Sequence, residues 1–182
     1  MKTVIIINGQ GGVGKNYICD IAALKYKIDI ISAAALPKKL ASECGWNGID
    51  KDEKTRKFLS DLLVAIREYN EGCNKYLINE TKKFADTEND ILFIHVREPK
   101  DIRYIYDGIK NIPNIKVKTL LILSPEGKKK YGNVGDDSVF DYDYDYNYVN
   151  DKLICYEKSK VNIMNLIDNI VSGSYVYERM NA

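Results

Sequence analysis

The feature that most constrains the fold of this chain is a glycine-rich segment between an apolar run and an amphipathic stretch. The apolar run TVIIIN (3–8) is rich in β-branched residues without alternation, which predicts a strand buried on both faces. From Gly14 to about residue 26, apolar residues recur at helical spacing. Between the two, GQGGVGK (9–15) matches G-x-x-x-x-G-K in the strand–loop–helix context that a phosphate-binding loop requires.

The chemistry of this loop follows from its backbone. Glycines let the chain curl so that successive N–H groups converge on phosphate oxygens. The helix that begins near Gly14 adds its positive end, and Lys15 can reach the terminal phosphates of a nucleoside triphosphate. We therefore expect the ATP phosphates to bind the loop and the start of the helix, that is, Gly9, Gln10, Gly11, Gly12, Val13, Gly14, Lys15, Asn16 and Tyr17.

Asn16 departs from the usual loop, in which a Ser or Thr hydroxyl follows the lysine and ligates magnesium. An amide oxygen is a poorer ligand but a possible one, directly or through water. The expected cofactors are ATP and Mg²⁺, with Asn16 as the candidate metal residue.

The rest of the chain alternates predicted strands and helices. Further strands are expected at 27–32, 90–96, 116–124 and about 144–149, and helices at 33–45, 51–70, 73–86, 99–111 and about 157–171. Segment 125–141 has no apolar periodicity, which predicts an exposed, mobile loop. Strands without internal alternation, separated by helices, indicate a parallel sheet covered on both faces. We expect one three-layer α/β domain over residues 1–182.

Composition argues against several other classes of protein. With 27 basic and 26 acidic residues, bulk charge favours neither nucleic acid nor an anionic membrane. No apolar stretch approaches the roughly 18 residues of a membrane span, and the N-terminal apolar run is too short for a signal peptide. Four scattered cysteines argue against a disulfide framework or a zinc site. We expect a cytoplasmic protein whose partner is a small nucleotide or phosphometabolite, and its oligomeric state stays open.

A GTPase would carry the guanine-reading pattern Asn-Lys-x-Asp after a late strand. The only Asn-Lys pair, Asn74-Lys75, is followed by Tyr76 and Leu77. A GTPase is therefore set aside.

Three further segments extend the argument: GWNGIDKDEKTRKFLSDL (45–62), LFIHVREPKDI (92–102) and GNVGDDSVFDYDYDYNYV (132–149). Together with the glycine loop they make the chain resemble the P-loop nucleotide and small-molecule kinases. The resemblance is nearest to phage-type deoxynucleoside monophosphate kinases, animal-type phosphomevalonate kinases and bacterial nucleotide-kinase-like proteins of this length. It implies a P-loop NTPase fold with a five-stranded parallel sheet of order 2-3-1-4-5 and a lid at about 125–141.

The resemblance also implies roles for individual residues. Lys15 matches the lysine that steadies the transferring phosphate, and Arg97 matches the arginine of a V-R pair at the end of a strand, so these two are the candidate catalytic residues. The acceptor's phosphate is expected on three arginines, Arg56, Arg97 and Arg103. The lid contributes Lys128, Lys129, Lys130 and Asp136. Asp136 is open to two interpretations: it helps to position magnesium or a base, or it is a plain turn residue.

Two positions depart from that family's pattern. His95 stands where relatives often carry an aspartate that organises magnesium, and the lid carries lysines where such kinases bring arginines. The sequence predicts an ATP-dependent kinase that transfers the γ-phosphoryl group to a small phosphorylated acceptor such as a (deoxy)nucleoside monophosphate. The alternative is a nucleotide-binding regulatory protein on a kinase scaffold, with catalysis weakened or lost.

Two aromatic features remain. FDYDYDYNY (140–148) has a strict two-residue period, which predicts an edge strand with its tyrosines on one face. Trp46 either stacks on a base or anchors a loop to the core.

Overall fold

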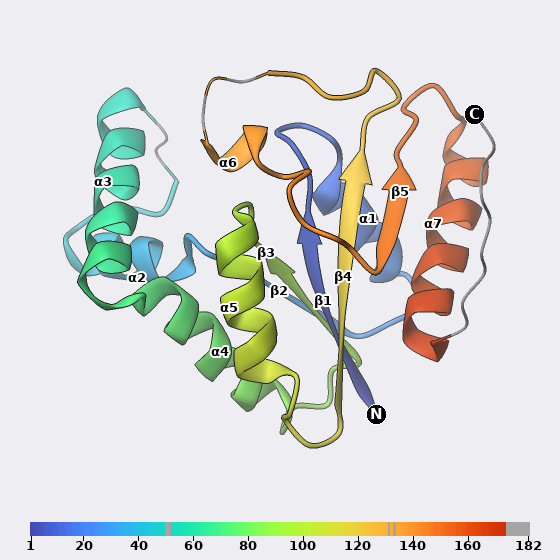
Figure 1. Ribbon diagram of the computed structural model, residues 1–182, viewed down its shortest axis with the longest axis horizontal. Helices are drawn as coiled ribbons and strands as arrows, with labels where there is room; N and C mark the ends of the chain where they lie inside the picture. The colour runs from blue at the N-terminus through green and yellow to red at the C-terminus, as the bar shows by residue number, and fades with distance from the viewer. Residues whose placement is uncertain (50–51, 131, 133, 174–182) are drawn as a thin grey trace.

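The computed structural model describes residues 1–49, 52–130, 132 and 134–173. Its strands form one parallel sheet of order β2-β3-β1-β4-β5 (Figure 1). The strands are β1 (Lys2–Asn8), β2 (Ile28–Ser32), β3 (Ile91–His95), β4 (Ile115–Leu123) and β5 (Tyr146–Val149). The predicted five-stranded sheet and its order are confirmed.

Helices cover both faces of this sheet. They are α1 (Lys15–Ala22), α2 (Ala35–Glu43), α3 (Glu53–Asn70), α4 (Gly72–Phe84), α5 (Pro99–Ile109), α6 (Val134–Asp137) and α7 (Tyr156–Ser172). Helices α1 and α7 pack on one face, and α4 and α5 pack on the other. The order of helices agrees with the prediction, except that the lid contains the short helix α6.

The central strand β1 shows why the apolar run folds in this way. Val4 and Ile6 are fully buried on the face covered by α4 and α5, and Ile5 and Ile7 are fully buried on the face covered by α1 and α7. A run with no polar alternation is what a strand between two helical layers needs. The parallel pairing brings the carboxyl ends of the strands to one edge, where Asn8 begins the glycine loop.

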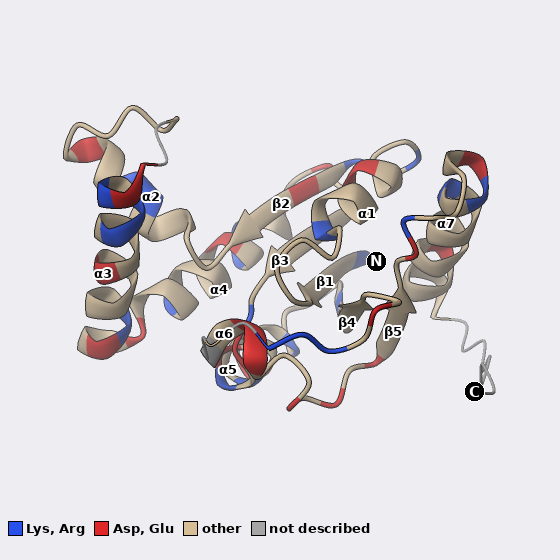
Figure 2. Ribbon diagram, turned by 90° about the horizontal axis from the view of Figure 1, so that it is seen from above, with Lys and Arg blue, Asp and Glu red and all other residues tan. Residues whose placement is uncertain are grey.

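Helix α3 stands apart from the sheet and is joined to it through α2 and α4 (Figures 1 and 2). None of its residues is fully buried. Its first turn is capped by Asp52, whose carboxylate accepts a hydrogen bond from the Thr55 amide at 2.7 Å. Near its other end, Arg67 forms ion pairs with Glu98 and the buried Asp101 of the α5 region. This arginine fastens α3 to the body of the domain.

The tyrosine repeat differs from its prediction. Strand β5 begins only at Tyr146, and it lies at the edge of the sheet as expected. Tyr142 and Tyr144 contact the core cluster under α4 and α5, whereas Tyr146 and Tyr148 contact the cluster under α1 and α7. The tyrosines therefore serve both faces of the sheet, because the regular strand covers only the second half of the repeat. In the described ranges, no helix is both long and apolar enough to cross a membrane.

Candidate functional site

The glycine loop leaves β1 and turns sharply into α1. Gly9 has φ +144° and Gly14 has φ +95°, values that side-chain-bearing residues rarely adopt. Space is also restricted at both positions. A Cβ on Gly9 would lie 2.6 Å from the Ile122 carbonyl oxygen, and a Cβ on Gly14 would lie 2.3 Å from Nδ2 of Asn150. The glycines of the motif are therefore required by conformation and by packing.

Lys15, the first residue of α1, folds back over the loop. Its Nζ donates hydrogen bonds to the carbonyl oxygens of Gly9 and Gln10, the latter at 3.0 Å. Burial and the neighbouring Arg97 lower the pKa of Lys15 to about 8, and the carboxylate of Asp136 opposes that shift. A partly buried ammonium group with few compensating charges is suited to bind an anion such as a phosphate.

The lid and the loop are joined by Gln10, the second residue of the motif. Its buried side-chain amide donates to the Lys129 and Asp136 carbonyls, and its oxygen accepts from the Lys129 amide at 3.0 Å. The basic stretch of the lid (blue in Figure 2) runs between the end of β4 and α6. The glycine loop and the lid thus form one hydrogen-bonded unit.

Arg97 follows β3 and lies beside the loop. Its Nη1 is 3.0 Å from Oδ2 of Asp136, a carboxylate whose side chain is only 6% exposed. The second half of the lid is therefore packed, with Val139 fully buried, so the prediction of an exposed loop was wrong for this part. Asp136 itself lies in the short helix α6, where Arg97 pairs with its carboxylate and Gln10 donates to its backbone carbonyl.

His95 is the last residue of β3, close enough to Lys15 to feel its charge. Its Nε2 is 3.6 Å from Sγ of Cys19 on α1. Burial and the charge of Lys15 lower the pKa of His95 to about 4, so the imidazole is neutral at pH 7. Burial raises the pKa of the Cys19 thiol to about 12, so this sulfur stays protonated. His95 and Cys19 therefore supply no negative charge at the position where P-loop kinases often carry an aspartate.

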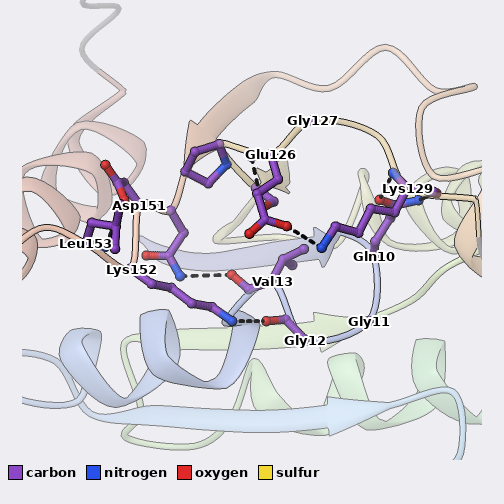
Figure 3. A pocket seen from close by; sticks show the side chains of 13 residues that line it. Gln10, Gly11, Gly12, Val13, Glu126, Gly127, Lys129, Asp151, Lys152 and Leu153 are labelled. Atoms are coloured by element: carbon purple, nitrogen blue, oxygen red, sulfur yellow. Dashed lines mark hydrogen bonds and ion pairs between the residues drawn. The ribbon is translucent and has the colours of Figure 1, made fainter.

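A cavity of about 330 Å³ adjoins the glycine loop (Figure 3). Its walls are the loop itself, the start of the lid at 124–127 with Lys129, and the segment 150–153 after β5. Two side chains of that last segment contact the loop: Asn150 donates to the Val13 carbonyl at 2.9 Å, and Lys152 donates to the Gly12 carbonyl at 2.9 Å. The cavity thus lies beside the glycine loop.

Sequence reasoning missed Asn150 and Lys152. The available signal was their position directly after the last strand, because ligands of open α/β sheets bind outside the carboxyl ends of the strands. It also missed Asn8, whose amide donates to the Arg97 carbonyl and to the Tyr144 hydroxyl, at 2.9 and 2.7 Å. Asn8 links the ends of β1 and β3.

Several predicted site residues lie elsewhere. Arg56 is exposed on α3, and its side chain makes no hydrogen bond or ion pair with the residues that the structure describes. Arg103 lies over the ring of Tyr142 and donates to the Asp141 carbonyl at 3.5 Å. The hydroxyl of Tyr17 reaches Ser159 of α7, so its side chain points away from the loop. Of the three predicted acceptor arginines, only Arg97 lies beside Lys15.

The remaining predicted residues lie at the surface. Asn16 is exposed in the first turn of α1. In the lid, Lys128 covers the ring of Phe140, Lys129 pairs with Glu126, and Lys130 is exposed. Trp46 is half-buried between α2 and α3 and does not line the cavity beside the loop.

Comparison with known proteins identifies the fold. No family model and no curated protein sequence matches the chain. Among solved structures, an unliganded sugar kinase from Janibacter matches with a TM-score of 0.52 and 14% identity, over 97% of this chain and 100% of that one. The tunicamycin resistance protein of Deinococcus radiodurans matches with a TM-score of 0.54 and 13% identity, over 92% and 96% of the two chains. The chain has a P-loop NTPase fold, and its structural neighbours include kinases.

Proposed function

We propose that this protein is a phosphotransferase that uses ATP to phosphorylate a small molecule. The observation that carries the proposal is the group of charges at one edge of the sheet: the Lys15 ammonium inside the glycine loop, with Arg97 and Asp136 beside it. Phosphoryl transfer needs positioning and neutralisation of charge more than covalent chemistry from the protein. These residues supply both.

The donor nucleotide binds at the glycine loop and in the cavity beside it. Its phosphates bind backbone N–H groups of residues 10–16, and its nucleoside part occupies the cavity beside the loop. A volume of about 330 Å³ is within the usual range for small-ligand pockets, roughly 300 to 1,000 Å³. The lid, held to the loop through Gln10, excludes water, so that the acceptor competes successfully with hydrolysis.

Magnesium accompanies the triphosphate in P-loop kinases. Within the described ranges, no group of three or more His, Cys, Asp or Glu side chains is arranged to hold a metal. The exposed Asn16 amide offers one oxygen ligand, which fits an ion held mainly by the nucleotide phosphates and water. When bound, the ion neutralises charge on the phosphates.

The class of acceptor is inferred from the resemblance and from the positions of the arginines. The resemblance implies a phosphorylated acceptor, most simply a (deoxy)nucleoside monophosphate bound by arginines. The place of Arg97 near Lys15 supports that role, although its Nη1 is paired with Asp136. Arg56 would need α3 to approach the loop, and Arg103 contacts the Asp141 carbonyl. The sugar kinase among the structural neighbours supports a small-molecule acceptor in general.

The test is ADP formation from ATP and magnesium over a panel of nucleoside monophosphates and small neutral alcohols. Turnover of at least one acceptor by the wild type, lost in Lys15→Ala and retained in Lys25→Ala, supports the proposal. Lys25 is a suitable control because it is exposed and pairs with Asp168 on α7, away from the loop. A blank across the panel, with ATP binding intact, contradicts the proposal.

A nucleotide-binding regulatory protein is the second candidate. The observation that favours it is the neutral His95 at the end of β3, where a carboxylate would organise magnesium. In that case ATP binds with equal affinity in the presence and absence of magnesium, and no acceptor is phosphorylated. Calorimetric titration of ATP under both conditions separates the two functions.

A further inference from the structure

The carboxylate of Asp136 occupies an unusual position for a lid residue. Its side chain is only 6% exposed, and Oδ2 lies 3.0 Å from Nη1 of Arg97 at the end of β3. The side-chain amide of Gln10 also donates a hydrogen bond to the backbone carbonyl of Asp136, at 3.2 Å. Asp136 is therefore fixed by both the strand edge and the phosphate loop.

Asp136 also supplies the negative charge that acts on Lys15. Among the described residues, it is the acidic group whose charge raises the pKa of Lys15, against the effects of burial and of Arg97. His95, the other titratable group beside Lys15, is neutral at pH 7. Among the described residues, the Lys15 ammonium thus has one arginine and one lid carboxylate, Asp136, beside it, whereas Glu126 and Asp151 line the neighbouring cavity.

This arrangement discriminates between two classes of acceptor. A phosphate monoester carries a charge of about −1.5 to −2 at pH 7, so its oxygens need no base and a buried carboxylate repels it. A hydroxyl group keeps its proton at pH 7, and a positioned carboxylate accepts a hydrogen bond from it and then the proton. A carboxylate beside the transferring phosphate therefore favours a hydroxyl acceptor.

We propose that the acceptor is a small alcohol and that Asp136 is the base that receives its hydroxyl proton. This inference rests on the proposed phosphotransferase function. In the reaction, the acceptor oxygen forms a bond to the γ-phosphorus, and the bond from that phosphorus to the β–γ bridging oxygen breaks. ADP leaves with the electron pair, and the hydroxyl proton moves to the Asp136 carboxylate, which releases it to solvent after the lid opens.

The experiment compares wild type, Asp136→Asn and Asp136→Glu on two acceptor sets, with products identified by ³¹P NMR. One set contains glycerol, monosaccharides and nucleosides, and the other contains nucleoside monophosphates. We expect wild type to form a phosphomonoester from an alcohol. Asp136→Asn should lower kcat for that alcohol about 100-fold or more, with the affinity for ATP unchanged, and Asp136→Glu should retain part of the activity. Asp137→Asn on the same helix is the matched control and should behave as wild type.

A binding measurement gives a readout independent of turnover. Because Asp136→Asn removes a negative charge and leaves Arg97 available to an anion, calorimetry should show AMP binding about 5-fold or more tighter than to wild type.

Three outcomes overturn the inference. Exclusive phosphorylation of nucleoside monophosphates refutes the alcohol acceptor while the phosphotransferase function stands, and an absence of any product refutes both. Recovery of kcat in Asp136→Asn at raised magnesium concentration assigns the carboxylate to the metal instead of the proton.

Discussion

Replacing Gly14 by alanine tests whether the glycine loop is held in shape by the segment after β5. Gly14 has φ +95°, and an alanine Cβ there would lie 2.3 Å from Nδ2 of Asn150. That amide is buried and donates to the Val13 carbonyl at 2.9 Å, so the new methyl group would displace it and break the bond. The left-handed strain costs about 1 to 2 kcal/mol, and the lost hydrogen bond costs about 1 to 3 kcal/mol. Gly14→Ala should therefore lower the free energy of unfolding by about 2 to 5 kcal/mol.

The control for this prediction is Gly12→Ala in the same loop. Gly12 also has a positive φ, +74°, but a Cβ there has no atom within 4 Å. It should therefore cost only the strain of about 1 to 2 kcal/mol. Urea denaturation monitored by circular dichroism gives both free energies of unfolding, provided that the m-values agree. Equal destabilisation by the two substitutions, or a neutral Gly14→Ala, would refute the role assigned to Asn150.

Three further predictions follow from other contacts. In Gln10→Ala, hydrogen exchange at the Lys129 amide should rise about 10-fold or more, because that amide donates to the Gln10 side chain; unchanged protection would contradict the link between loop and lid. The pKa of Lys15 is about 8 in the folded state, and its ordinary value is 10.5. Between pH 8 and pH 10.5 the unfolded chain therefore binds more protons than the folded one, and the free energy of unfolding of wild type should rise with pH. Lys15→Met should lack this rise in urea denaturation across the same range, and an unchanged pH slope would contradict the burial of the ammonium group. Arg67→Ala should lower the free energy of unfolding by about 3 kcal/mol, because it leaves the buried carboxylate of Asp101 without its cation. The control Lys57→Ala, which breaks an exposed ion pair, should change it by about 0.5 kcal/mol or less. Equal effects of the two substitutions would refute the role of Arg67 in holding α3.

The fold was predictable because its signals are local. The apolar run 3–8 and the glycine motif lie next to one another, and the helices other than α6 show their own periodicity. The order of the strands came from the resemblance to P-loop kinases, since periodicity within a strand says nothing of its neighbours. The short helix α6 was missed because four residues are too few to show a helical period.

The site was predictable only in part because several of its contacts join distant segments. Lys15 and the loop follow from the motif. The pairing of Arg97 with Asp136 and the contact of Asn150 with the loop depend on where β3, the lid and β5 meet, and no local pattern records that. The tyrosine repeat failed for a related reason: alternation predicts faces only while the chain remains a strand, and here the strand begins at Tyr146.

The most direct test of the central claim is a calorimetric titration of ATP with magnesium into wild type, Lys15→Ala and the control Lys25→Ala. Loss of a charged hydrogen-bond donor to phosphate should weaken binding about 10- to 100-fold in Lys15→Ala. Lys25→Ala should bind ATP as wild type does. An absence of ATP binding by wild type, or equal affinity in wild type and Lys15→Ala, would contradict the assignment of the glycine loop as a nucleotide-binding site.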